Sequence, residues 1–299
     1  IDIIVRPDLI EIAKMMPEVN KIYSLDIDHN SLGLAKRYRL AKTIKKNLYT
    51  SSIILPNSFK SAIIPWLANI PIRIGYKREL RSILLTQKYS LAKHEDTMVN
   101  RYLKLVNSSY SECLRPFLNI DMSTLELTRK KYIISNSRKN IFLCPEAEYG
   151  VAKRWPINKW IELAKYFEEN NHNVYLLGKD KNLERQYKSI LKIDSITSLL
   201  GKTSLIEATY LLSLADLAVT NDSGLMHITA SLDTKLISIF GSSSPFYTPP
   251  LMKDMLGEVI YKGLKCSPCF KRECPLDHLN CLNNISVDEI FKKSLKYLN

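Results

Sequence analysis

The chain has 299 residues and a formal net charge of +13, with 45% hydrophobic and 24% charged residues. This composition excludes an intrinsically disordered chain, and the length predicts two domains of roughly 150 residues each. No apolar run reaches the ~18 residues of a membrane span, and the first residues lack the features of a signal peptide.

The first half of the chain alternates short apolar runs with amphipathic stretches. The apolar runs predict strands over 1–6, 20–25, 51–56 and 72–76. The amphipathic stretches predict helices over 8–16, 31–47, 60–69 and 95–108. The regular alternation of apolar and amphipathic stretches is lost over 109–138. We place the connection between two domains there, with the domains covering 1–130 and 131–299. Because the chain begins inside a predicted strand and without Met, we expect part of the N-terminus to be missing.

The second half shows the same alternation more clearly. Strands are predicted over 140–145, 173–178, 217–220 and 235–241. Helices are predicted over 157–170, 181–191, 204–215, 223–232 and 286–298. Ser204 and Ser286 precede two of these helices as expected N-caps. Such alternation is typical of βαβ units, so we expect an α/β fold with two doubly wound, Rossmann-like domains.

Ligands of open α/β sheets bind beyond the carboxyl ends of the strands. Three polar strand ends in the second half, at 145–156, 220–227 and 241–250, are therefore candidate sites. No G-x-G-x-x-G follows a strand and no G-x-x-x-x-G-K-[ST] occurs, so a dinucleotide dehydrogenase and a P-loop protein are poorly supported.

The stretch "TNDSGLMH" places Ser223 and Gly224 at the start of a helix. Free backbone N–H groups there form an anion site, which a glycine lets a phosphate approach closely. Asp222 has a purely structural alternative as a helix cap. His227 falls one turn into the helix, within reach of the same ligand, although a lone histidine is more often structural.

Two neighbouring loops could complete a phosphate site. "FGSSSPFYTPP" offers hydroxyl and amide donors, among them Ser242 and Ser243. "PEAEYGVAKRWP" offers Lys153 and Arg154, which could supply positive charge to a diphosphate. The alternatives are an ordinary serine- and proline-rich loop and a basic surface turn.

These motifs, together with "LPNSFKSAIIPWLANIPIRIGY", resemble the bacterial ADP-heptose:lipopolysaccharide heptosyltransferases, glycosyltransferase family nine. The resemblance spans almost the whole chain and is strongest to the heptosyltransferase II branch. It implies a GT-B fold, with two Rossmann-like domains facing a cleft and the donor nucleotide in the C-terminal one. It also implies inverting transfer of heptose from ADP-heptose to the lipopolysaccharide inner core. Transfer of the second heptose is favoured over transfer of the first. No cofactor and no catalytic metal are implied.

The resemblance also implies roles for individual residues. The donor-binding residues would be Lys153, Glu184, Asp222, Ser223, Gly224, His227, Ser242 and Ser243, with Lys153 at the diphosphate and Glu184 near the ribose. On the acceptor side, Asn57, Ser58 and Lys60 would face the cleft, with Lys60 near the acidic acceptor.

The chain departs from the family pattern in several places. Glu146 and Asn69 stand where the family has Gly, and Val151 stands where it has Pro. The family's first strand and its Gly-x-x-Gly-Asp loop, whose Asp is the general base, are expected upstream of residue 1. We therefore expect an exposed sheet edge in the first domain. We also expect the chain to bind the donor but to transfer heptose poorly, because a general base contributes ~10²–10⁴-fold to the reaction rate. A non-catalytic sugar-nucleotide-binding remnant is the alternative.

The six cysteines divide into two groups. Cys113 and Cys144 lie in apolar surroundings and are expected to be core thiols. The other four follow one another closely and could hold a structural zinc, with His278 as an alternative ligand, although reduced or loosely paired thiols are favoured: they are Cys266, Cys269, Cys274 and Cys281.

The basic charge favours acidic partners, although compositional drift would also produce it. A nucleic-acid-binding protein is the rival function, but no aromatic side chains interleave with the basic residues, so we expect no nucleic acid partner. The resemblance implies a Kdo-lipid A or heptosyl-Kdo-lipid A acceptor. We accordingly expect a cytoplasmic protein, peripherally bound to the anionic inner face of the inner membrane.

Overall fold

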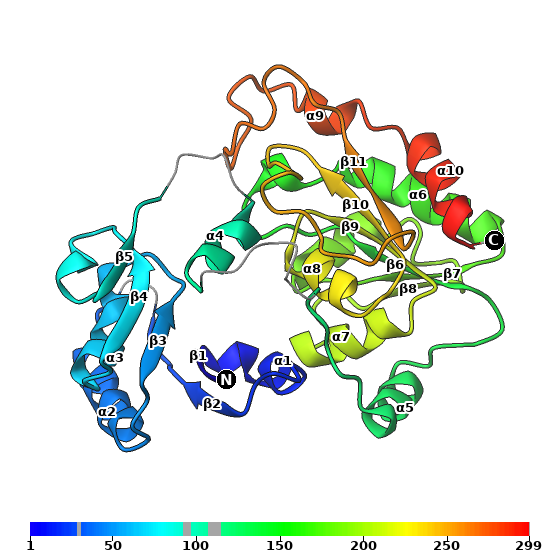
Figure 1. Cartoon of the computed structure of the whole chain (residues 1–299). Coiled ribbons are helices and arrows are strands. Elements are labelled where there is room, and N and C mark those ends of the chain that lie inside the picture. The colour runs from blue at the N-terminus through cyan, green and yellow to red at the C-terminus, as the bar shows by residue number, and fades with distance from the viewer. Residues whose placement is uncertain (29–30, 92–96, 107–114, 299) are drawn as a thin grey trace. The chain divides into compact units, whose positions relative to one another are not determined.

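The computed structural model describes residues 1–28, 31–91, 97–106 and 115–298 (Figure 1). Contacts divide the chain into two compact units, Ile1–Leu114 and Arg115–Asn299. Helix α5 (Met122–Lys131), which spans the expected boundary at residue 130, thus belongs to the second unit. Residues 95, 96, 107 and 108 of the helix expected over 95–108 lie outside the described residues, as does Cys113.

The first unit contains two small parallel sheets. Strands β1 (Asp2–Val5) and β2 (Lys21–Ser24) form one sheet. The other has the order β3-β4-β5, from β3 (Ser51–Ile54), β4 (Ile72–Tyr76) and β5 (Gln87–Tyr89). Among the described residues, β1 pairs with β2 alone and β3 with β4 alone. One edge of β1 and one edge of β3 are therefore without a strand partner. Ile4 in β1 and Ile53 in β3 are 40% and 45% exposed.

Short helices connect these strands. The helix expected over 60–69 is a 3₁₀ turn, η2, that continues into α3, and the helix expected over 8–16 begins likewise as η1 before α1. The elements are η1 (Pro7–Leu9), α1 (Ile10–Lys14), α2 (Leu34–Lys45), η2 (Phe59–Ala62), α3 (Ile63–Leu67), η3 (Arg81–Ile83) and α4 (Met98–Lys104).

The second unit is built on a six-stranded parallel sheet of order β11-β10-β9-β6-β7-β8. Chain order runs outward in both directions from the neighbouring strands β6 and β9, which is the arrangement of a doubly wound fold with its switch point between them. The strands are β6 (Asn140–Cys144), β7 (Asn173–Leu176), β8 (Ile196–Ser198), β9 (Leu217–Asn221), β10 (Leu236–Phe240) and β11 (Gly257–Tyr261).

Helices cover both faces of this sheet, because alternate strand residues point to opposite sides. Ile141 and Leu143 pack in one core with α6 (Ile157–Glu169), α9 (Asn280–Asn283) and α10 (Val287–Leu298). On the other face, Phe142 and Cys144 pack with α7 (Leu205–Ser213) and α8 (Gly224–Ser231). The expected doubly wound α/β fold is thus confirmed for this unit.

The main difference from the expected elements follows β7. A helix is expected over 181–191, but the chain forms the 3₁₀ helix η6 (Lys181–Tyr187). The apolar side chains of this segment are still buried in the core, although the backbone is not α-helical: they are Leu183, Tyr187 and Ile190. Within the described residues, no helix has the length and apolar composition required to cross a membrane.

Candidate functional site

The carboxyl ends of β6 and β9 are joined by one buried side chain, Asn221. Its Nδ2 donates to Pro145 O (2.6 Å), and its Oδ1 accepts from Trp155 N (3.1 Å). Asn221 is fully buried, so both bonds are shielded from water. The last residue of β9 thereby fixes both ends of the loop that carries Lys153, although Asn221 was not among the predicted site residues.

Lys153, Asp222 and Ser243 come together from three different strand ends. Lys153 ends the 3₁₀ turn η5 (Val151–Lys153), and its Nζ lies 2.5 Å from Asp222 Oδ2. Ser243 Oγ donates to the same carboxylate oxygen. The side chains of Asp222 and Lys153 are 5% and 18% exposed, so the ion pair is largely removed from solvent.

The start of α8 leaves polar groups available beside this ion pair. Ser223, the N-cap residue, makes no side-chain cap bond, and its buried Oγ has no partner among the described residues. A Cβ atom added at Gly224 would meet no atom within 4 Å, so the space beside the first helical residue is open. This helix start can therefore accept an anion.

His227 lies one turn along the same helix. The protein around its imidazole lowers its pKa by desolvation, which Asp222 opposes and Lys153 reinforces. The residue as a whole is nevertheless exposed. His227 is therefore predominantly neutral near pH 7 and can donate or accept a hydrogen bond.

Ser242 completes this part of the site. It is 2% exposed, and its Oγ has no hydrogen-bond partner in the described part of the chain. Its backbone N–H donates to Ala152 O (3.3 Å), which joins the loop after β10 to the loop after β6. The three strand ends thus present a lysine, hydroxyl groups and a helix N-terminus, a combination suited to phosphate groups.

Glu184 lies apart from this ion-pair cluster. It belongs to η6, and its Oε1 accepts from Lys202 Nζ (2.8 Å), which also donates to Ser198 O (2.9 Å). The bond from Lys202 lowers the pKa of Glu184. In the described chain, no hydrogen bond or ion pair connects Glu184 with Lys153 or Asp222. Its predicted place near the ribose stays a prediction.

In the first unit, the loop that carries Asn57, Ser58 and Lys60 is held by a buried arginine. Arg81 is fully buried, and its Nη2 donates to Asn57 Oδ1 (3.1 Å). Its Nη1 donates to Pro56 O and to Ser61 Oγ, and its Nε donates to Tyr76 O (2.7 Å). The bond to Oδ1 leaves the Asn57 Nδ2 donor for other partners. Arg81 was not among the predicted site residues.

Two of the departures from the family pattern have structural explanations. Glu146 accepts backbone N–H bonds from Lys179 (2.9 Å) and Asp180 (2.7 Å), so it caps the loop after β7. Asn69 has a φ of 55°, and asparagine tolerates this left-handed conformation better than other non-glycine residues. Val151 is 50% exposed, and nothing in the structure explains its replacement of proline.

The described cysteines are all free thiols. Cys144 is buried in the core, as expected, and burial raises its pKa. Burial also raises the pKa of Cys281, with further contributions from Cys269, Cys266 and Cys274. No group of three or more His, Cys, Asp or Glu side chains in the described ranges is placed to hold a metal ion.

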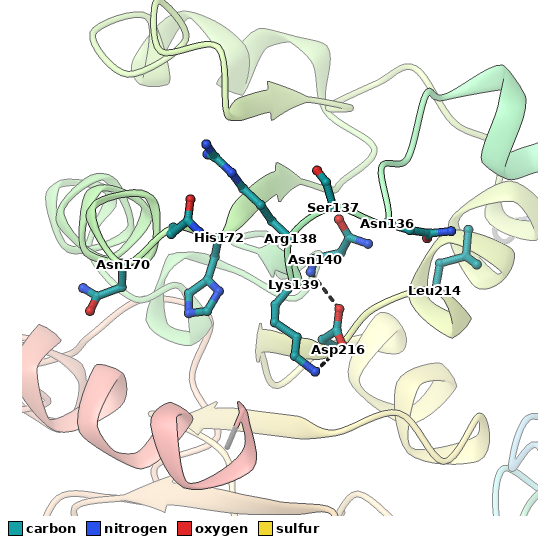
Figure 2. Close-up of a pocket in the computed structure, with 10 residues that line it drawn as sticks. Asn136, Ser137, Arg138, Lys139, Asn140, Asn170, His172, Leu214 and Asp216 are labelled. Atoms are coloured by element: carbon teal, nitrogen blue, oxygen red, sulfur yellow. Dashed lines mark hydrogen bonds and ion pairs between the residues drawn. The ribbon is translucent and has the colours of Figure 1, made fainter.

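A hollow of about 580 Å³ lies at the opposite, amino edge of the sheet (Figure 2). Asn140, Asn170, His172 and Asp216 are among its lining residues, and Figure 2 shows Lys139 directed at Asp216. None of the predicted site residues lines it. We regard the carboxyl edge as the candidate site, because ligands of doubly wound sheets bind there.

Comparisons with known proteins agree on one family. The model of "Glycosyltransferase family 9 (heptosyltransferase)" matches residues 37–280. Lipopolysaccharide heptosyltransferase 2 of Salmonella typhimurium is 37% identical over 251 residues, which cover 79% of this chain and 72% of that protein. Lipooligosaccharide heptosyltransferase 2 of Haemophilus influenzae is 37% identical, with the same two coverages.

Solved structures give the same answer for the fold. The structure of E. coli ADP-heptose lps heptosyltransferase II has a TM-score of 0.83 and 28% identity, covering 99% of this chain and 88% of that one. A family 9 glycosyl transferase from Veillonella parvula has the same TM-score at 16% identity, which supports the fold alone. The chain therefore belongs to glycosyltransferase family 9, the heptosyltransferases, with their GT-B-like α/β fold and their glycosyltransferase activity.

Proposed function

We propose that this protein transfers heptose from ADP-heptose to the inner core of lipopolysaccharide, and that the heptose transferred is the second one. The names of its heptosyltransferase 2 relatives support this assignment. The observation that carries it is the cluster of Lys153, Asp222 and Ser243 beside the start of α8.

In this proposal the second unit binds the donor. Lys153 contacts the diphosphate, and Ser223, Gly224, Ser242 and Ser243 supply hydroxyl and backbone donors around it. His227 contacts the donor from the next turn of α8, while Glu184 binds the ribose. Asp222 keeps Lys153 in place. Positive charge and oriented N–H groups stabilise the negative charge that develops on the departing ADP.

The first unit, in turn, takes the acceptor, a Kdo-lipid A or heptosyl-Kdo-lipid A. Asn57, Ser58 and Lys60 offer amide, hydroxyl and ammonium groups, which suit its carboxylates and phosphates. We further propose that the protein works in the cytoplasm, peripherally bound to the inner membrane, because its charge of +13 favours an anionic lipid surface. Co-sedimentation with liposomes tests this, and equal binding to neutral and anionic vesicles would contradict it.

Calorimetric titration with ADP-heptose tests the donor site. We expect Lys153→Met to weaken binding by about 10- to 100-fold, the loss expected for one charge-assisted contact. Lys165→Met, at an exposed position of α6, is the matched control and should bind as the parent chain does. Equal affinity of the two variants would refute the role of Lys153.

A transfer assay with purified acceptors separates the functions. Transfer to heptosyl-Kdo-lipid A in preference to Kdo-lipid A supports the proposal, whereas the reverse preference would assign the first heptose. Donor binding without transfer to either acceptor would favour a non-catalytic sugar-nucleotide-binding protein. Salt-sensitive DNA binding without ADP binding would favour the nucleic-acid alternative.

A further inference from the structure

The donor site holds less positive charge than a diphosphate requires. The ion pair between Lys153 and Asp222 cancels one unit charge against the other. The lowered pKa of His227 leaves its imidazole predominantly neutral near pH 7. The start of α8 adds only about half a positive charge. A diphosphate, with about two negative charges, would therefore meet a nearly neutral site unless another cation were close.

Arg272 is a cation that contacts the same aromatic ring as Lys153. The two residues share one aromatic side chain, Tyr149, whose ring centroid lies 5.1 Å from Lys153 Nζ and 5.3 Å from Arg272 Cζ. Arg272 is exposed, so its guanidinium is accessible to a ligand without repacking of the core. Arg154, the residue after Lys153, also carries a positive charge, but its Nε is bonded to Ala147 O (3.0 Å).

The backbone at Arg272 is fixed to the loop that carries Lys153. Ala152 N donates to Arg272 O (3.0 Å). A Cβ atom at Gly150 would lie only 2.4 Å from the same oxygen, so the approach of the two backbones requires glycine at this position. The position of Arg272 relative to Lys153 is thus set by main-chain contacts.

The segment around Arg272 is also bonded to the loop after β10. Phe270 N donates to Ser242 O (2.7 Å), and Ser267 Oγ donates to Gly241 O (2.5 Å). Tyr149 Oη donates to Phe270 O (2.8 Å). The cysteine-rich segment 264–282 is therefore joined to both loops that supply donor-site residues.

We propose that Arg272 is a further donor-binding residue, whose guanidinium contacts the diphosphate of the nucleotide sugar. The inference rests on the proposed function, since it assigns a ligand group to the same strand-end site. A planar guanidinium can bind two phosphate oxygens at once, which a lysine cannot do. Arg272 thereby supplies the charge that the Lys153–Asp222 pair lacks.

Titration with ADP at several salt concentrations tests this. Arg272→Ala should weaken ADP binding about tenfold and reduce its salt dependence, because one ionic contact is lost. Arg272→Lys should recover part of the loss, since it keeps the charge without the fork. Lys271→Ala removes the same charge from the neighbouring exposed position and should change the affinity less than twofold. Circular dichroism verifies that each variant is folded.

The possible outcomes are distinct. If the parent chain binds ADP tightly and the Arg272→Ala variant binds ADP with the same affinity, the role of Arg272 is overturned and the proposed donor site is left intact. Equal losses in Arg272→Ala and Lys271→Ala, or a loss without change in salt dependence, would also overturn it. Absence of ADP binding by the parent chain would overturn the proposed function and this inference together.

Discussion

Lys153 Nζ and Asp222 Oδ2 lie 2.5 Å apart although the two residues are 69 positions apart in the sequence. The contact forms because β6 and β9 are neighbours in the sheet and their carboxyl ends meet at the switch point. A charged pair this far from water is strongly sensitive to the loss of either partner.

The first prediction concerns that pair. Asp222→Asn leaves a largely buried ammonium without its counter-charge and should lower the free energy of unfolding by about 2–3 kcal/mol. Asp288→Asn breaks an exposed Asp–Lys pair (2.8 Å) in the same unit and should cost less than about 0.5 kcal/mol. Urea unfolding of the two variants measures the difference, and equal losses would contradict the special role of the buried pair.

A second prediction separates ligand binding from folding at Gly224. Because a Cβ there meets no protein atom, Gly224→Ala should not destabilise the fold, and the better helix propensity of alanine could add up to about 1 kcal/mol. The added methyl group would, however, occupy the space into which a phosphate approaches. We expect an unchanged or higher melting temperature together with a weaker affinity for ADP. Loss of both would mean that Gly224 serves the fold.

Arg81 provides the third prediction. Arg81→Lys cannot donate to Tyr76 O, Pro56 O and Asn57 Oδ1 together, so buried acceptors lose their donors. We expect the first unit to lose about 2 kcal/mol or more of stability. Arg78→Lys, at an exposed position nearby, is the control and should stay within about 0.5 kcal/mol. Thermal unfolding, detected by proteolysis of the first unit, measures the stability of both variants.

The fourth prediction is a pH dependence of the second unit. Burial lowers the pKa of His172, whose buried Nδ1 has no partner among the described residues. The folded state therefore binds fewer protons than the unfolded state, in which the pKa is about 6.5. The resulting stability is fully present above that pH and is lost as the pH falls towards the lowered pKa.

Melting temperatures between pH 7.5 and 5.5 check this. His172→Gln should make the decrease at low pH smaller than in the parent chain. The same change at His227, whose pKa is also lowered by desolvation, should act in the same direction. An identical pH profile for His172→Gln and the parent chain would contradict the assignment.

The parts of the fold that the sequence predicted are those with strong apolar patterns. The buried strands β6, β9 and β10 are continuous apolar runs, and so their carboxyl ends and the residues after them could be located. The three strands that were missed, β5, β8 and β11, are all edge strands. Edge strands are short or half-exposed and therefore lack a continuous apolar run.

The candidate site was predictable only in part, for a related reason. Asp222 and Gly224 stand at a strand-to-helix turn, which local sequence reveals. Asn221 donates to Pro145 O and Arg81 donates to Pro56 O, carbonyl groups that lie far away in the sequence, so local sequence does not distinguish the two residues from surface residues. An asparagine at the end of an otherwise apolar strand was the one available signal.

A crystal structure of the protein with ADP tests the central claim most directly. We predict that the diphosphate lies within hydrogen-bond distance of Lys153 Nζ and of backbone N–H groups at the start of α8, at the carboxyl edge of the second sheet. Density for ADP at the amino edge instead, in the hollow lined by His172 and Asp216 (Figure 2), would contradict the account.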